Sequence, residues 1–194
     1  MNNMSPISPA RALAFACFFE SALLGVAYAA GWLAGFDPMA TVATDAAAII
    51  LGLVAVMPML ILLWWGLQHP QGPIGRVTTL ARDFVHQFLG GIGLPGFALI
   101  SLLAGVCEEA LFRGFLQTFV GMHSSEVVGL LVAAVLFGLA HSVSVAYGVL
   151  ATVIGVYLGL LFLLSGNLIV PVICHTVYDF IALAWLGRTM STSK

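Results

Sequence analysis

The chain has 194 residues, of which 61% are hydrophobic and only 7% are charged, whereas about 25% of residues are charged in a typical soluble domain. This deficit excludes an ordinary soluble enzyme and a disordered segment. Six basic residues against eight acidic ones leave no cationic surface for a nucleic acid. The composition therefore predicts an integral membrane protein, with room for about six spans of roughly 20 residues each.

The first half of the chain predicts two membrane spans and one amphipathic helix. Apolar runs cover residues 12–34 and 46–67, and both are long enough to cross a bilayer. A polar, loop-forming segment follows from Gln68 to Arg82. Apolar side chains recur at helical spacing at Val77, Leu80, Phe84 and Phe88. Because charged residues lie between them, we expect a helix that lies at the membrane surface.

The second half predicts four further spans. The third runs over residues 97–119 and the sixth over 168–186. The apolar run 127–164 is too long for one span, so we divide it near residues 141–147. Within it, Gly155 and Gly159 form a small-xxx-small pair that favours close helix packing.

Six spans would place both chain termini on one side of the membrane. On that side would lie the basic residues outside the third span: Arg11, Arg76, Arg82, Arg188 and Lys194. Since basic residues concentrate on the cytoplasmic side of membrane proteins, we expect both termini to be cytoplasmic.

Ionisable side chains are concentrated inside the predicted spans of the second half. They are Glu108, Glu109, Arg113, His141, His175 and Asp179. Such a group costs at least about 2.5 kcal/mol at mid-bilayer, so each one is a functional hypothesis. The alternative is a polar network that only holds the bundle together. Glu20, in the first span, either reaches the same cluster or extends to the interface, and we leave it outside the predicted site.

Helical spacing sorts these groups into pairs. Glu109 and Arg113 are four residues apart, with the acid on the N-terminal side, which favours an ion pair. Glu108 lies about 100° further around the helix and remains unpaired. His175 and Asp179 are also four apart, so the carboxylate can fix the tautomer of the imidazole.

On this interpretation Glu108, His141 and His175 point into a common cavity, and Glu109 and Arg113 form a supporting pair. A carboxylate that is kept out of water is a suitable general base. One unpaired Glu beside two His therefore suits the activation of water and the stabilisation of an oxyanion, which are the steps of peptide hydrolysis.

Three motifs on successive apolar segments resemble one known family. Glu108-Glu109-Ala-Leu-Phe-Arg113 reads as EExxxR, Phe137 to His141 as FxxxH, and His175 to Asp179 as HxxxD. Their order is similar to that in the CAAX protease and bacteriocin-processing family of intramembrane glutamic-type endopeptidases, also called CPBP, ABI or Rce1-like. The resemblance covers about residues 96–186.

The resemblance implies a polytopic all-α membrane bundle with its active site in a cavity. It implies that Glu108 and His141 activate water, while His175 and Asp179 stabilise the oxyanion. In the prenyl-protein endopeptidases the last position is commonly Asn. An ionised Asp cannot donate a hydrogen bond, so Asp179 is either protonated or orients His175. We expect a bacterial inner-membrane protein that cleaves a membrane-associated peptide or protein.

Other mechanisms fit the sequence less well. It contains no GxSxG, HExxH or GxGD motif, which argues against serine, zinc-HExxH and aspartyl proteases. Two His and a carboxylate would also make a reasonable zinc site, but the resemblance favours a metal-free mechanism without a cofactor. The alternative function is non-catalytic, for instance a bacteriocin self-immunity factor or scaffold, and a proton-coupled carrier is less consistent with six helices without repeats.

The expected organisation has three parts. Residues 1–95 form N-terminal membrane helices and a polar loop, residues 96–187 form the catalytic membrane core, and residues 188–194 form a short cytoplasmic tail. We expect the lipid bilayer and a membrane-associated substrate as partners, and no nucleic acid.

Overall fold

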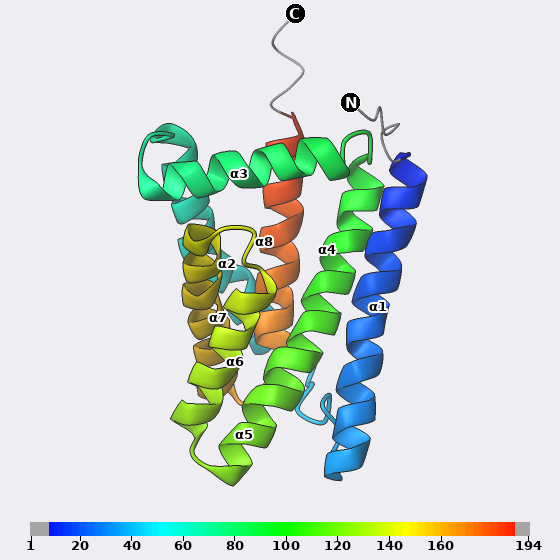
Figure 1. Ribbon diagram of the computed structural model, residues 1–194. Helices are drawn as coiled ribbons and strands as arrows, with labels where there is room; N and C mark the ends of the chain where they lie inside the picture. Colours follow the sequence, from blue (N-terminus) through cyan, green and yellow to red (C-terminus); the bar gives the residue numbers. More distant parts are fainter. Residues whose placement is uncertain (1–7, 189–194) are drawn as a thin grey trace, which may run out of the picture.

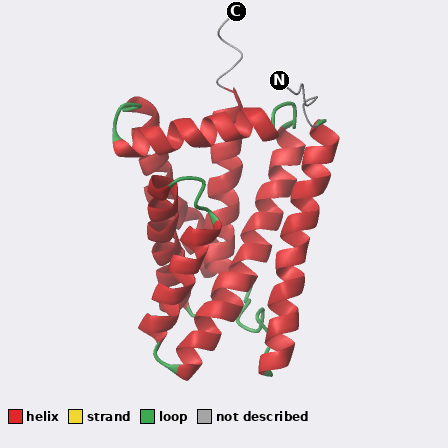
Figure 2. Cartoon of the chain, in the orientation of Figure 1, coloured by secondary structure: helices red, strands yellow, loops and turns green. Residues whose placement is uncertain are grey.

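A computed structural model describes residues 8–188, which form an all-helical bundle with no strand in this range (Figures 1 and 2). The elements are α1 (Pro9–Ala34), α2 (Ala46–Gln68), α3 (Pro73–Phe88), α4 (Leu94–Glu109), the π-helix η1 (Ala110–Gln117), α5 (Thr118–His123), α6 (Glu126–Ala140), α7 (Val145–Ser165) and α8 (Ile169–Arg188). The predicted fold class, a polytopic helical bundle, is confirmed.

Local chemistry sets the ends of these helices. Asp45 caps α2, and its Oδ1 atom accepts a hydrogen bond of 2.9 Å from the backbone N–H of Ala48. Ser125 and Ser144 cap α6 and α7 in the same way. A serine or aspartate at this position satisfies a backbone donor that has no partner inside the helix. The polar residues between the apolar runs therefore mark where each helix begins.

The membrane spans agree with the prediction except at one helix. In the described part of the chain, five helical segments are long and apolar enough to cross a membrane: α1, α2, the continuous segment 94–123, α7 and α8. The fourth predicted span is α6, which is apolar but has only 15 residues. At 1.5 Å per residue it is about 22 Å long, less than the roughly 30 Å of a bilayer core. Consequently α6 ends inside the bundle, and the turn that follows it lies below α3 (Figure 1).

The predicted amphipathic helix is α3. It lies across one end of the bundle, the end at which α1 begins and α8 finishes (Figure 1). Val77 and Val85 are buried on its inner face. Its two arginines, Arg76 and Arg82, lie at the same end as Arg11 and Arg188. Lys194 and most of the predicted tail lie outside the described residues.

Small residues allow the helices that carry the polar cluster to approach closely. A Cβ atom added to Gly105 of α4 would collide with Thr176 of α8. A Cβ atom on Gly155 of α7 would come within 3.1 Å of the backbone of Ala134 in α6. The predicted packing role of Gly155 is therefore confirmed. The approach of α4 to α8 places Glu108 and Glu109 beside His175.

Candidate active site

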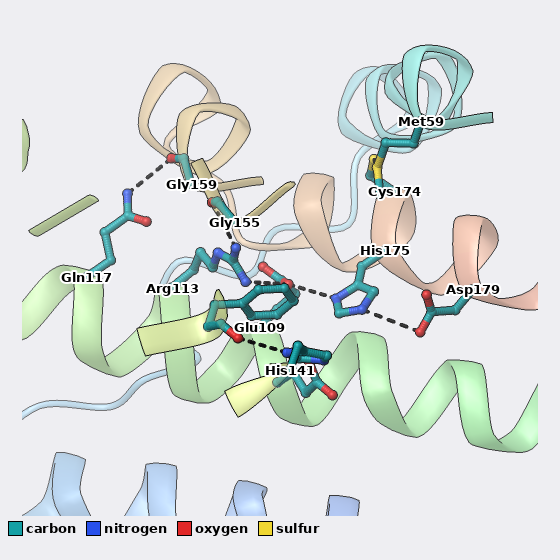
Figure 3. Close-up of polar contacts among 12 residues, drawn as sticks. Met59, Glu109, Arg113, Gln117, His141, Gly155, Gly159, Cys174, His175 and Asp179 are labelled. Atoms are coloured by element: carbon teal, nitrogen blue, oxygen red, sulfur yellow. Dashed lines mark hydrogen bonds and ion pairs between the residues drawn. The ribbon is translucent and has the colours of Figure 1, made fainter. Parts of the chain in front are cut away.

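Glu109 is the centre of a buried polar network (Figure 3). Its Oε1 atom accepts a hydrogen bond of 2.8 Å from Nη1 of Arg113 and another of 2.8 Å from Nδ1 of His175. Glu109 and Arg113 are both 0% exposed. The predicted contact between Glu109 and Arg113 is present, and the contact with His175 extends it from α4 to α8.

Arg113 and Gln117 connect this network to α7. Nη2 of Arg113 donates to the carbonyl oxygen of Gly155 at 2.9 Å, and Nε2 of Gln117 donates to that of Gly159 at 3.0 Å. Both side chains belong to the π-helix η1, and both acceptors are glycine carbonyls one turn apart on α7. The guanidinium of Arg113 also lies 4.7 Å from the centre of the Phe137 ring. The network therefore fixes η1 against α6 and α7.

His141 presents one ring nitrogen to Glu108. Its Nδ1 atom lies 2.8 Å from the carbonyl oxygen of Phe137, which can only accept a hydrogen bond. We therefore assign the ring proton to Nδ1, which leaves Nε2 of a neutral ring as an acceptor. Nε2 lies 3.6 Å from Oε2 of Glu108. A proton donor such as a water molecule can bind to both atoms at once.

His175 lies between two carboxylates. Its Nδ1 atom contacts Glu109, and its Nε2 atom lies 3.4 Å from Oδ2 of Asp179 on the next turn of α8. Figure 3 shows both contacts on opposite sides of the ring. With Nδ1 held by Glu109, the ring directs Nε2 toward Asp179. The predicted contact between His175 and Asp179 is thus present.

These groups face a cavity of about 450 Å³. Glu108, His141, His175 and Asp179 all line it, together with Glu20 of α1. The rest of the wall is largely apolar and comes from α2, α3, α7 and α8. The predicted common cavity is therefore present, whereas Glu109 and Arg113 lie outside its lining.

Three features of the site did not follow from the sequence interpretation. Helical spacing identifies partners within one helix, so it could not find the contact of Glu109 with His175 on another helix. Gln117 has no charge, and nothing in its pattern singled it out. Glu20 could have been included in the predicted site, because it is an ionisable residue inside an apolar run.

The candidate residues do not form a compact ligand set for a metal. Within residues 8–188, no group of three His, Cys, Asp or Glu side chains is close enough to hold a metal ion. Glu108 and His141 lie side by side on the cavity wall, 3.6 Å apart, while each ring nitrogen of His175 faces a carboxylate.

Comparison with known proteins matches the part of the chain that carries these residues to one family. Residues 90–181 match the family described as "Type II CAAX prenyl endopeptidase Rce1-like", and all three sequence motifs fall within this range. The chain is also 33% identical over 86 residues to the uncharacterized protein YpbD of Bacillus subtilis (strain 168). That match covers 44% of this chain and 43% of the length of the relative. No solved structure gives a significant match.

Proposed function

We propose that the chain hydrolyses a peptide bond in a membrane-associated protein or peptide, because its residues 90–181 match the Rce1-like family of CAAX-type intramembrane proteases. Its apolar helices and its family make it an integral membrane protein. The observation that carries the proposal is the pair of acceptors, Oε2 of Glu108 and Nε2 of His141, 3.6 Å apart on the wall of the cavity.

The first step is the activation of water by Glu108 and His141. A water molecule between them donates one hydrogen bond to each acceptor, so its oxygen faces the cavity. Glu108 takes a proton as this oxygen attacks the carbonyl carbon of the peptide bond. Because Oε2 of Glu108 has no hydrogen-bond partner in residues 8–188, the carboxylate is free for this role.

The second step is the stabilisation of the oxyanion by His175. With a proton on each nitrogen, the ring donates from Nδ1 to Glu109, and its Nε2 proton is shared between Oδ2 of Asp179, 3.4 Å away, and the oxyanion that forms in the cavity. Asp179 then acts as the acceptor that orients the ring, a role in which an ionised carboxylate is suitable. Finally Glu108 returns its proton to the leaving amine, the C–N bond breaks, and an acid and an amine are released. No step requires a metal or another cofactor.

The arrangement of α3 supports access from one side. Its residues line the cavity, and its arginines lie at the end where α1 begins and α8 finishes. By the positive-inside rule this end is cytoplasmic. We therefore propose that the substrate enters from the cytoplasmic side of a bacterial inner membrane.

The test compares membrane-associated peptides in cells that produce the wild-type chain, Glu108→Ala or His141→Ala. We expect mass spectrometry to find cleavage products in the wild type, and uncleaved precursors accumulating in both variants. Glu126→Gln is the matched control, because this exposed acid begins α6 at the far end of the bundle. A permeant chelator should leave the wild-type pattern unchanged.

Two results of this comparison would contradict the proposal. One is an identical peptide pattern in all four strains. The other is a loss of both variant proteins from the membrane, which would mean that the cluster only stabilises the bundle, as expected of a scaffold or immunity factor.

Asp179 offers a more specific prediction about the oxyanion step. Asp179→Asn should retain cleavage to within about tenfold, because an amide oxygen still accepts from His175 and the amide N–H₂ can donate to the oxyanion. Asp179→Leu removes both functions and should lower kcat by roughly 10²-fold or more. Initial rates on an identified substrate in proteoliposomes measure both values. Equal rates for the two variants would show that Asp179 does not orient His175.

A further inference from the structure

Glu20 is a carboxylate near the middle of the 26-residue helix α1, and the proposed mechanism does not use it. It lines the same cavity as Glu108, His175 and Asp179. It also lies within electrostatic range of all three residues. An ionisable group at this depth is costly unless it has a function.

The position of Glu20 on α1 directs it into the bundle. Leu13 and Ala16 pack against the apolar cluster around Phe97, and Ala27 and Gly31 are buried further along the helix. Glu20 is seven residues after Leu13 and four after Ala16, so it shares their face. Packing does not require an acid at this position, since its neighbours on the face are small or apolar.

Glu20 also lacks a partner. The other two carboxylates of the cavity each face an imidazole: Glu108 faces His141, and Asp179 faces His175. Glu20 forms no hydrogen bond or ion pair with any residue from 8 to 188, and its Oε2 atom is buried. No Lys or Arg is found among the described residues that line the cavity. Asp179 thus faces His175, and Glu108 forms the proposed water-activating pair with His141, so Glu20 is the cavity acid that is left without an assigned partner.

From this imbalance we infer that the cavity binds a basic side chain of the peptide substrate, and that Glu20 is the carboxylate that pairs with it. A Lys or Arg side chain combines an apolar stem with a cationic head. The stem suits the apolar wall formed by Leu80, Phe84 and Leu183, and the head suits Glu20. A peptide with a carboxylate at the same place would be repelled by three acids.

This inference rests on the proposed function in one respect: it takes a peptide to be the molecule that binds in the cavity. Because Glu20 and Glu108 line the same cavity, the basic residue would occupy the cavity in which the bond is cleaved. Glu20 would therefore determine specificity without taking part in the proton transfers.

The experiment measures binding separately from hydrolysis. Three apolar photoreactive peptides are identical except for one central residue, which is Lys, norleucine or Glu. Their affinities are measured by photolabelling in phosphatidylcholine vesicles, with the protein in a Glu108→Gln background that prevents turnover. Glu20→Gln, Glu20→Asp and, as a distant acidic control, Glu126→Gln are compared in this background, and each is checked for folding by thermal unfolding.

We expect the Lys peptide to bind at least about tenfold more tightly than the norleucine peptide, which corresponds to about 1.4 kcal/mol. The Glu peptide should bind more weakly than both. Glu20→Gln should reduce the ratio of Lys to norleucine binding to about twofold or less, whereas Glu20→Asp and Glu126→Gln should preserve the preference.

The inference would be overturned if the three peptides labelled the protein equally, whatever the extent of labelling. A preference for Lys that survives in Glu20→Gln would also overturn it, because another group would then bind the cation. Hydrolysis of the same peptides is measured in parallel with Glu108 intact. If binding depends on Glu20 and no peptide is hydrolysed, the proposed function fails while the binding site remains.

Discussion

Replacing Glu108 by glutamine is expected to lower the rate of peptide hydrolysis by about 10²- to 10⁴-fold, the usual contribution of a general base, and to leave the stability of the protein unchanged. Glutamine has nearly the same shape as glutamate but cannot accept the proton from water. Stability should be unaffected because Oε2 of Glu108 makes no hydrogen bond within residues 8–188. Initial rates in proteoliposomes and thermal unfolding in detergent measure the two effects.

The two outcomes of this experiment separate catalysis from structure. A fall in activity together with a fall in the unfolding temperature would mean that Glu108 holds the bundle together. Full activity in Glu108→Gln would show that Glu108 is not the general base and that another residue activates water.

Replacing Glu109, the residue next to Glu108, should instead affect the stability of the fold. Replacing Glu109 by glutamine, or Arg113 by methionine, is expected to destabilise the fold by roughly 3–5 kcal/mol, the cost of breaking a buried ion pair by removing one partner. Glu109 and Arg113 are fully buried, and Glu109 holds both Arg113 and His175. Abundance in the membrane and the free energy of unfolding in detergent measure this loss.

A double variant provides the control for this prediction. Glu109→Gln combined with Arg113→Met leaves no charge in the pair, and the amide oxygen of the glutamine can still accept from Nδ1 of His175. The double variant should therefore be more stable than the sum of the two single effects predicts, by about 0.5–3 kcal/mol. Strictly additive losses would show that the two residues stabilise the bundle independently.

The fold could be predicted well from the sequence because five helical segments of the described chain follow apolar runs that are long enough to cross a bilayer. The main difference concerns α6. The run 127–164 divides near residues 141–147 as predicted, but α6, the first of its two helices, has only 15 residues and is too short to cross a bilayer core. The polar residues His141, Ser142 and Ser144 mark the break, but they do not show how deep in the bundle it lies.

The candidate site was predictable where its contacts lie within one helix or meet at a common cavity. The pairs Glu109–Arg113 and His175–Asp179 follow from a spacing of four residues. The contact between Glu109 and His175 depends instead on the close approach of α4 and α8 at Gly105. Glycine in an apolar run is too common to indicate which two helices meet there.

The short length of α6 affects how water, a reactant in the proposed hydrolysis, reaches the candidate site. Each hydrolysed bond consumes one water molecule, which an ordinary bundle of full-length spans would exclude from its interior. The turn after α6 bends sharply: the N–H of Val143 bonds to the carbonyl oxygen of His141, and Ser142 bonds to that of Leu139. Polar backbone at this depth is tolerated where it lines a hydrated space. Residues of this turn line the cavity together with residues of α3, so in the proposed mechanism water would reach Glu108 from this end of the bundle.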